Sequence, residues 1–339
     1  MKQVYLLFWH YNTAGCVWEQ TNETMLKNIQ LPAIMEINPA FCYPIEKDSA
    51  HAPVAHTCIQ NEEEENMKFG YCVSMGAQDP AGIGYERIPT LQKLGFDYVE
   101  MPLAQIMSLE DQAFRTGPLA TVEQCGLPCL RMNNFFPASI RLTGPEADHD
   151  SALSYAQAAL ERAARLGGKV IVFGSSGARN RPCGTSTSQG LEQLASLLAH
   201  LKYMAKDHGI TIAIEHLNKQ ESNLINLFSE GCALARRVND PGIGALLDTF
   251  HMNLSGETYN DVLKGGTLLR HVHIARTLGR SLPCPGDEED YGLLFQTLKK
   301  IGYDGCISME AFARMDFESE AEAALNHLRI LYQNTKIGA

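Results

Sequence analysis

I-T-I-A-I-E-H-L-N at residues 210–218 and G-A-L-L-D-T-F-H-M at residues 244–252 are two apolar runs that each lead into a carboxylate, and a helical segment separates them. Isoleucines dominate the first run, and a nearly continuous β-branched run is typical of a parallel strand that is covered on both faces. Glu215 and Asp248 therefore stand at the ends of two strands. Because a buried, unpaired carboxylate is costly, we expect both side chains to face water, a cation or a substrate.

Two strand ends further along the chain carry similar groups. L-L-R-H-V-H-I at residues 268–274 puts His271 and His273 on the same side of a strand, and C-I-S-M-E-A-F at residues 306–312 contains Glu310 where its apolar run ends. Four successive strand ends thus offer Glu, Asp, His and Glu. Three carboxylates and one imidazole suit a divalent cation of intermediate hardness, such as Mn²⁺, Co²⁺ or Mg²⁺.

Apolar strands alternate with helical patterns from Met67 onward. The helices include residues 151–166, 191–206 and 318–333. The predicted strands are Phe69–Val73, Tyr98–Met101, Cys129–Asn133, Val170–Phe173, Thr211–Ile214, Gly244–Leu247, Leu269–Ile274 and Cys306–Met309. Eight strands, each followed by a helix, predict an α/β protein with a single (β/α)₈ TIM barrel over residues 67–339. An open doubly wound sheet is disfavoured, because Gly82-Ile83-Gly84 lacks the third glycine and the acidic strand end of a dinucleotide site.

Residues 1–66 show no sustained helical or alternating period, contain four prolines and close with E-E-E-E-N. This lack of pattern predicts that residues 1–66 form an irregular, poorly structured N-terminal extension before the barrel. One explanation is an arm that packs on the barrel or on a partner. We favour the other, in which Met67 is the true start and residues 62–66 translate a purine-rich ribosome-binding sequence.

The composition excludes several classes of function. The net charge of −11, from 28 basic and 39 acidic residues, argues against a nucleic-acid partner. No segment approaches the roughly 18 apolar residues that a membrane helix requires. The ten cysteines form no C-x-x-C pair, which predicts reduced thiols and a cytoplasmic protein.

Other polar residues near the strand ends admit two interpretations each. His251 could donate a hydrogen bond to a substrate or be an ordinary loop histidine, whereas we interpret His216 and His271 as structural. The loop F-G-S-S-G-A-R at residues 173–179 could bind a phosphate through backbone amides, or form a tight turn whose Arg179 lines a pocket. The aromatic residues of N-N-F-F-P, which ends at Pro137, could shield a sugar or plug the rim.

Together these segments resemble the xylose-isomerase-like TIM barrels of the sugar phosphate isomerase/epimerase superfamily. The closest match in motif is the group of ketose 3-epimerases that act on D-tagatose and D-psicose. The likeness runs from Met67 to the carboxyl terminus. It is densest in G-G-K-V-I-V-F-G-S-S-G-A-R, I-E-H-L-N-K-Q-E, L-L-D-T-F-H-M-N and H-V-H-I-A.

The resemblance implies a metal-dependent sugar isomerase or epimerase that binds Mn²⁺, or else Co²⁺ or Mg²⁺. The implied metal ligands are Glu215, Asp248, His273 and Glu310, and the implied substrate contacts are Glu221, His251 and Arg280. Of these, Glu215 and Glu310 are the implied catalytic pair: one removes a proton beside the carbonyl to give a metal-bound enediolate, and the other returns a proton to the opposite face. A homodimer or tetramer acting on a small sugar is also implied.

Three alternatives remain open at this point. A lyase of the same fold, such as an inosose dehydratase or a deglycosylating subunit that acts on oxidised glycosides, would share the enediolate and eliminate a group. A hydrolase of the endonuclease IV kind is disfavoured by the acidic composition. A barrel that binds a ligand without turning it over is disfavoured by the two glutamates.

Overall fold

The computed structural model describes residues 9–12, 15–18 and 67–336. The chain divides into two units, residues 1–64 and 65–339. In the first unit, β1 (Trp9–Asn12) and β2 (Gly15–Trp18) form a two-stranded antiparallel hairpin, for which the sequence pattern predicts no strands. Our two explanations for residues 1–66 concern a segment that lies mostly outside the described residues.

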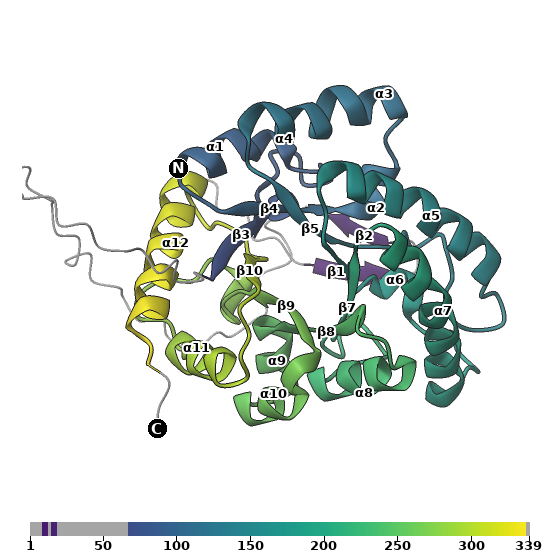
Figure 1. Ribbon diagram of the computed structural model, residues 1–339. Helices are drawn as coiled ribbons and strands as arrows, with labels where there is room; N and C mark the ends of the chain where they lie inside the picture. Colours follow the sequence, from purple (N-terminus) through teal and green to yellow (C-terminus); the bar gives the residue numbers. More distant parts are fainter. Residues whose placement is uncertain (1–8, 13–14, 19–66, 337–339) are drawn as a thin grey trace, which may run out of the picture. The chain divides into compact units, whose positions relative to one another are not determined.

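The second unit is a closed barrel of eight parallel strands, in which each strand pairs with the next along the chain and the last pairs with the first (Figure 1). The strands are β3 (Lys68–Cys72), β4 (Tyr98–Pro102), β5 (Cys129–Asn133), β6 (Val170–Phe173), β7 (Thr211–Glu215), β8 (Ile243–Asp248), β9 (Leu269–Ile274) and β10 (Cys306–Met309). All eight predicted strands are present, and their ends differ from the prediction by at most one residue. The predicted TIM barrel is therefore confirmed.

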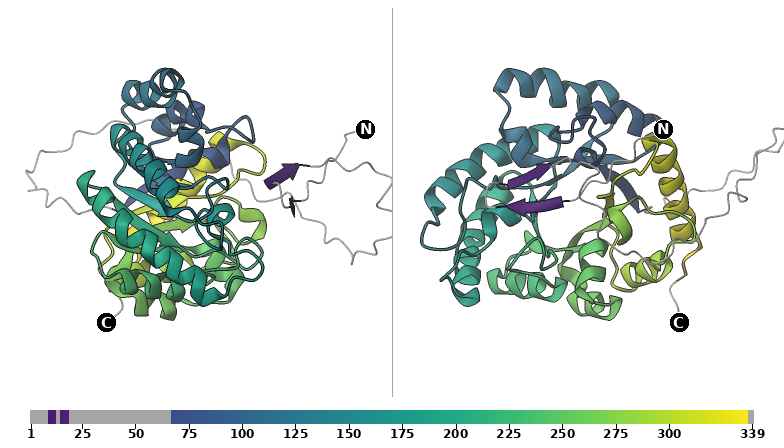
Figure 2. Two further views of the ribbon diagram at one scale, coloured as in Figure 1. Left: turned by 90° about the vertical axis from the view of Figure 1, so that its right-hand side faces the viewer. Right: turned by 180° about the vertical axis from the view of Figure 1, so that it is seen from behind.

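Helices surround the barrel in a ring that is visible in Figure 1 and in the right-hand view of Figure 2. They are α1 (Ile88–Lys93), α2 (Leu103–Met107), α3 (Asp111–Phe114), α4 (Ala120–Cys125), α5 (His149–Leu166), α6 (Ser176–Arg179), α7 (Thr187–Asp207), α8 (Phe228–Val238), α9 (Thr249–Ser255), α10 (Tyr259–Gly265), α11 (Tyr291–Lys300) and α12 (Phe317–Asn334). Among the described residues, no helix combines the length and the apolar character needed to cross a membrane.

Local signals explain where the long helices begin and end. Helix α5 begins where Asp148 accepts a hydrogen bond from the Ser151 amide, and it ends at Gly167, whose φ of 93° suits glycine. Helix α7 begins four residues before the predicted start, because Ser186 and Gln189 form a capping box ahead of its apolar face.

The interior of the barrel is divided between apolar and polar side chains. Outside it, the main apolar core fills the space between the sheet and the helices. A separate small apolar cluster comes from strands β6, β7 and β8 and consists of Val170, Val172, Ala213 and Leu246. Strands β4, β9 and β10 instead contribute a hydrogen-bonded group of buried polar side chains, which we call the lower network: Tyr98, Glu100, His271 and Ser308. The lower network lies beneath the site described next.

Candidate metal-binding and active site

Four strand ends bring their predicted ligands to one rim of the barrel. Glu215 ends β7, Asp248 ends β8, His273 lies in β9, and Glu310 directly follows β10. One donor atom from each side chain lies within 4.8 Å of the other three. We call these four residues the rim cluster. Parallel barrels carry functional groups at the carboxyl ends of their strands, so the position of the cluster is the expected one.

His273 occupies the centre of the rim cluster. Its Nδ1 atom lies 3.2 Å from Oε1 of Glu215 and 3.1 Å from Oε2 of Glu310. Its Nε2 atom lies 2.9 Å from Oε1 of Glu100, in the lower network. The imidazole therefore has carboxylates on both sides, and its two nitrogens face different surroundings.

Arg280 is the cationic side chain that pairs with the rim cluster. Its Nη2 atom donates to Oε2 of Glu310 and, at 3.3 Å, to Oδ2 of Asp248. The guanidinium also lies 4.9 Å from the centre of the Phe250 ring, a cation–π distance. The backbone of Arg280 has a φ of 45°, in the left-handed region that favours glycine. Such strain persists where the surrounding contacts over-determine a conformation, and it is concentrated at functional sites.

Asp248 uses its two carboxylate oxygens for different purposes. Oδ1 accepts hydrogen bonds from the amides of Phe250 and His251 and so caps helix α9, while Oδ2 faces Arg280. One oxygen thus fixes the side chain on a helix end, where a carboxylate is favoured. The other oxygen is directed at the rim cluster.

The predicted substrate contacts Glu221 and His251 meet beside the cluster. Nδ2 of Asn218 lies 2.9 Å from Oε1 of Glu221 and 2.9 Å from Nδ1 of His251. Because burial lowers the pKa of His251 to about 3, the ring is neutral, and Nδ1 accepts from Asn218. Its proton is therefore on Nε2, which finds no hydrogen-bond partner among the described residues and lies 3.5 Å from Asp248 Oδ2. No pattern in the sequence marked Asn218 as the residue that joins these two side chains.

The two glutamates of the cluster have opposite electrostatic surroundings. Burial, reinforced by the charges of Glu310 and Asp248, raises the pKa of Glu215 to about 7, although a hydrogen bond with His273 opposes the rise. Burial also acts to raise the pKa of Glu310, but Arg280 and His273 outweigh it and bring the value to about 2. The buried carboxylates of Glu215 and Asp248 and the partly buried carboxylate of Glu310 thus share one arginine and one imidazole. This donor set fits a divalent cation, which would offset the repulsion among them.

Glu215 is held from the loop after β6. A Cβ atom at Gly174 would lie 1.9 Å from Oε2 of Glu215, so only glycine leaves room for this carboxylate. Nη1 of Arg179 donates to the backbone oxygens of Phe173 and Glu215, at 2.8 and 2.7 Å. Arg179 is fully buried, so the interpretation that it lines a pocket is wrong: its guanidinium joins the ends of β6 and β7.

Besides Asn218, two more buried polar residues at the site could not be recognised from the sequence. Glu100 is the one charged residue within Y-V-E-M-P, and a lone charge in an apolar strand was the available signal. Nδ2 of Asn133 donates to Oε1 of Glu310 at 3.1 Å, while its Oδ1 is buried without a hydrogen-bond partner in the described part of the chain. The neighbouring Phe135 and Phe136 are buried, with ring centres 4.3 Å apart. Their burial agrees with the interpretation that these aromatic residues plug the rim.

His216 and His271, which we interpreted as structural, are both fully buried. Nε2 of His216 accepts from the Asp248 amide at 3.3 Å, and burial lowers the pKa of this imidazole to about 3. The two nitrogens of His271 contact the Cys306 carbonyl and Glu100. Neither side chain is part of the four-residue rim cluster.

Comparisons with known proteins agree with this geometry. The family described as "Xylose isomerase-like TIM barrel" matches residues 88–331. The ketose 3-epimerase of Arthrobacter globiformis is 26% identical over 281 residues, which cover 80% of this chain and 93% of that enzyme. The D-psicose 3-epimerase of Agrobacterium fabrum is 34% identical over 113 residues, which cover 32% of this chain and 38% of that enzyme.

Among solved structures, the D-psicose 3-epimerase with D-tagatose from Clostridium cellulolyticum H10 superposes with a TM-score of 0.68 at 22% identity. The superposition covers 78% of this chain and 99% of that chain. At this level of identity the superposition shows a shared fold.

Proposed function

The chain belongs to the xylose isomerase-like TIM barrel family, and from this membership we propose that it is a divalent-metal-dependent epimerase of a free ketose, inverting the carbon next to the carbonyl. It is an enzyme of the isomerase class, like the ketose 3-epimerases to which it is related. The observation that carries the finer proposal is the rim cluster, in which four donors from four successive strand ends lie within 4.8 Å of one another.

The proposed metal ligands are Glu215, Asp248, His273 and Glu310. Their oxygen and nitrogen donors support Mn²⁺ as the preferred ion, with Co²⁺ or Mg²⁺ as substitutes. A divalent cation held there would act as a Lewis acid that polarises a carbonyl and acidifies the neighbouring C–H bond.

Glu215 and Glu310 are the proposed catalytic pair. One carboxylate accepts the proton from the carbon next to the carbonyl, and the electron pair of the C–H bond moves toward the carbonyl oxygen. The other carboxyl group then donates a proton to the opposite face of the same carbon, which inverts it. Their unequal pKa values support this division, because Glu310 is held ionised while Glu215 titrates near neutrality.

Three further residues are proposed to bind the sugar. The unpartnered Nε2–H of His251 is available to donate to a substrate oxygen. The carboxylate of Glu221, whose side chain is 36% exposed, is available to accept from a hydroxyl. Arg280, 19% exposed, is available to donate to a substrate oxygen while it holds Glu310.

Incubation of the metal-loaded protein with a panel of ketoses in D₂O tests the proposal. We expect deuterium to enter at the carbon next to the carbonyl and the epimer to accumulate. Absence of exchange with every ketose would contradict proton-transfer chemistry. Loss of water or of an aglycone without epimer formation would instead identify a lyase. The similarity to ketose 3-epimerases makes the lyase the less favoured alternative.

We also propose that residues 67–339 form the catalytic domain, that the protein is a homodimer or tetramer, and that it is cytoplasmic. The free thiols of the barrel cysteines support the last point, since reduced thiols are typical of that compartment. Light scattering of the purified protein tests the assembly: a monomer would contradict it.

A further inference from the structure

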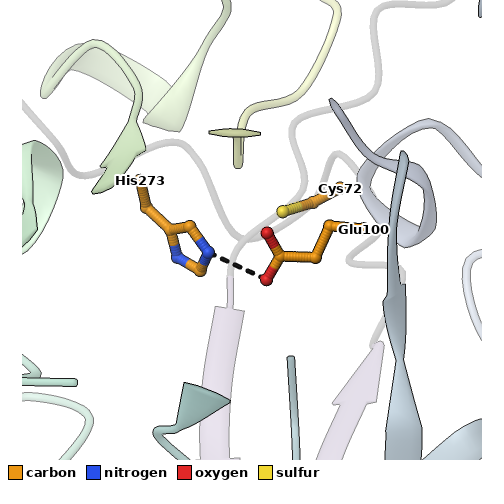
Figure 3. Close-up of side chains that lie close together, drawn as sticks. All are labelled: Cys72, Glu100 and His273. Carbon is orange, nitrogen blue, oxygen red and sulfur yellow. Dashed lines mark hydrogen bonds and ion pairs between the residues drawn. The ribbon is translucent and has the colours of Figure 1, made fainter. Parts of the chain in front are cut away.

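Glu100 lies directly beneath the rim cluster and is fully buried. Each of its carboxylate oxygens meets a different histidine: Oε1 lies 2.9 Å from Nε2 of His273, and Oε2 lies 2.8 Å from Nε2 of His271. Figure 3 shows His273 and Glu100 pointing toward one another, with the Cys72 thiol beside them. The contact joins β4 to β9 across the barrel.

The direction of this hydrogen bond decides which nitrogen of His273 can bind a cation. An ionised carboxylate only accepts hydrogen bonds, so Nε2 of His273 is the donor and carries a proton. Nδ1 faces the carboxylates of Glu215 and Glu310. A cation held among these carboxylates would take the place of the Nδ1 proton, so Nδ1 is the nitrogen that can supply a lone pair to it. Metal-bound histidines commonly have their tautomer fixed in this way by a carboxylate on the far side.

We propose that Glu100 is a positioning residue that fixes the ring orientation and tautomer of His273, so that the Nδ1 lone pair is presented to the metal. This inference rests on the proposed function, because it takes the rim cluster as the metal site. Glu100 itself touches neither the metal nor the sugar. Its effect on turnover is transmitted through the metal.

The surroundings of Glu100 favour this role over a second metal site. Cys72, Glu100 and His273 lie close enough to share an ion. However, both oxygens of Glu100 already have histidine partners, and Ser308 Oγ donates a further hydrogen bond to Oε2. On the far side, His271 is anchored by the Cys306 carbonyl, 3.1 Å from its Nδ1. A cation would have to break the bond between Glu100 and His273.

Glu100→Gln is the primary test, because an amide has nearly the same shape but cannot accept from both histidines through two oxygens. The measurement is the Mn²⁺ dissociation constant, by competition with a chelator. We expect it to rise about 10- to 100-fold. We also expect turnover to recover toward the wild-type value at saturating Mn²⁺, since Glu100 does not touch the sugar.

Ser308→Ala is the matched control. It removes one hydrogen bond to the same carboxylate but leaves both histidines paired, and we expect its Mn²⁺ affinity to stay within about threefold of wild type. Thermal unfolding and circular dichroism establish that each variant is folded. A folded Glu100→Gln protein with wild-type Mn²⁺ affinity would overturn the inference.

A second measurement needs no variant at Glu100. Neutron diffraction from Mn²⁺-loaded wild-type crystals should show deuterium on Nε2 of His273 and none on Nδ1. Deuterium on Nδ1 and none on Nε2 would contradict the inference. So would a wild-type protein that binds two Mn²⁺ ions per chain when the Cys72→Ser variant binds only one. If the wild-type protein binds no divalent cation, the proposed function fails. If the wild-type protein binds Mn²⁺ and Glu100→Gln binds it equally well, only the inference about Glu100 fails.

Discussion

The rim cluster and the lower network use the same chemical groups, carboxylates and histidines, in adjacent layers of one barrel, yet their hydrogen bonding differs. In the lower network, Glu100 is shared by two imidazoles, which outweigh the effect of burial and lower its pKa well below the ordinary value. In the rim cluster, three carboxylates share one arginine and one imidazole, and the pKa of Glu215 rises to about 7.

This difference indicates what each layer is for. Both carboxylate oxygens of Glu100 find hydrogen-bond partners among the described residues. This is expected of buried polar groups that rigidify a core. Beside the rim cluster, Nε2 of His251 and Oδ1 of Asn133 are buried without hydrogen-bond partners among the described residues. An unpaired buried polar atom costs about 1–3 kcal/mol, so the rim is arranged for groups that the polypeptide does not supply.

Replacing either carboxylate of the proposed catalytic pair should have the largest effect. Glu215→Gln and Glu310→Gln remove a proton acceptor while keeping the side-chain size, and we expect turnover to fall about 10²- to 10⁴-fold. Deuterium exchange into the ketose measures the loss. Glu320→Gln, which alters a carboxylate that accepts only backbone amides after β10, is the control. An equal loss in the control would show that the effect is not specific to the rim.

Gly174→Ala should be the next most damaging change. The added Cβ would meet Oε2 of Glu215 at 1.9 Å, so the carboxylate must move out of the rim cluster. A displacement of about 1 Å at a reacting group costs about 10²-fold in rate. Steady-state kinetics at saturating Mn²⁺ measures this.

Gly292→Ala is the matched control for that change. Near Gly292 an added Cβ would meet only a side-chain oxygen of Asp290, at 3.3 Å, and its backbone is not left-handed. We expect this variant to retain wild-type turnover. Full activity in Gly174→Ala would mean that the position of Glu215 is not critical.

The stability of the rim should depend on pH and on the metal. Because the pKa of Glu215 is raised to about 7 from 4.5, the folded protein holds this proton more tightly than the unfolded chain does. The resulting destabilisation is absent below about pH 4.5 and complete above about pH 7, where it reaches ~3 kcal/mol in the metal-free protein. The opposite shift of Glu310, to about 2, acts in a separate window, because its stabilisation is lost as the pH falls from about 4.5 to 2.

A cation bound to the rim should cancel the contribution of Glu215. We therefore expect the increase in melting temperature on adding Mn²⁺ to be larger at pH 8 than at pH 5. The increment is the correct readout, because His216 and His251, whose pKa values are lowered to about 3, gain stability as the pH rises toward 6.5 with or without metal. A metal-induced increment that is flat with pH in the wild type would contradict the assignment of Glu215 as a ligand.

The sequence predicts the barrel and the rim cluster because both depend on local patterns. Each apolar run marks a strand, and a charge at its end identifies a group at the rim, since all carboxyl ends of parallel strands face the same way. This reasoning located Glu215, Asp248, His273 and Glu310 without any knowledge of their contacts.

The supporting contacts could not be predicted in the same way. Glu100 is 173 residues from His273, and Asn133 is 177 residues from Glu310, and these pairs meet only because the barrel closes in one register. Gly174 is needed because a side chain at this position would clash with Glu215, and no local sequence rule anticipates that contact. The fully buried Arg179 shows the limit of motif reading, because a loop rich in glycine and serine suggested a ligand where the arginine instead binds backbone carbonyls.

Tyr98→Phe should have the smallest effect and gives the sharpest test of the lower network. Ser308 donates to Glu100, so the Tyr98 hydroxyl, 2.7 Å from Ser308 Oγ, is the donor in that pair. Its removal should cost about 1 kcal/mol in the free energy of unfolding, measured with urea, because the ring that packs against Gly70 is retained. We expect turnover and Mn²⁺ affinity within about twofold of wild type, since the two bonds between Glu100 and the histidines remain. A double-mutant cycle with Ser308→Ala measures the coupling energy between the two hydroxyl groups. A loss of turnover comparable to that of Glu310→Gln would contradict the conclusion that the lower network supports the structure while the rim cluster carries the chemistry.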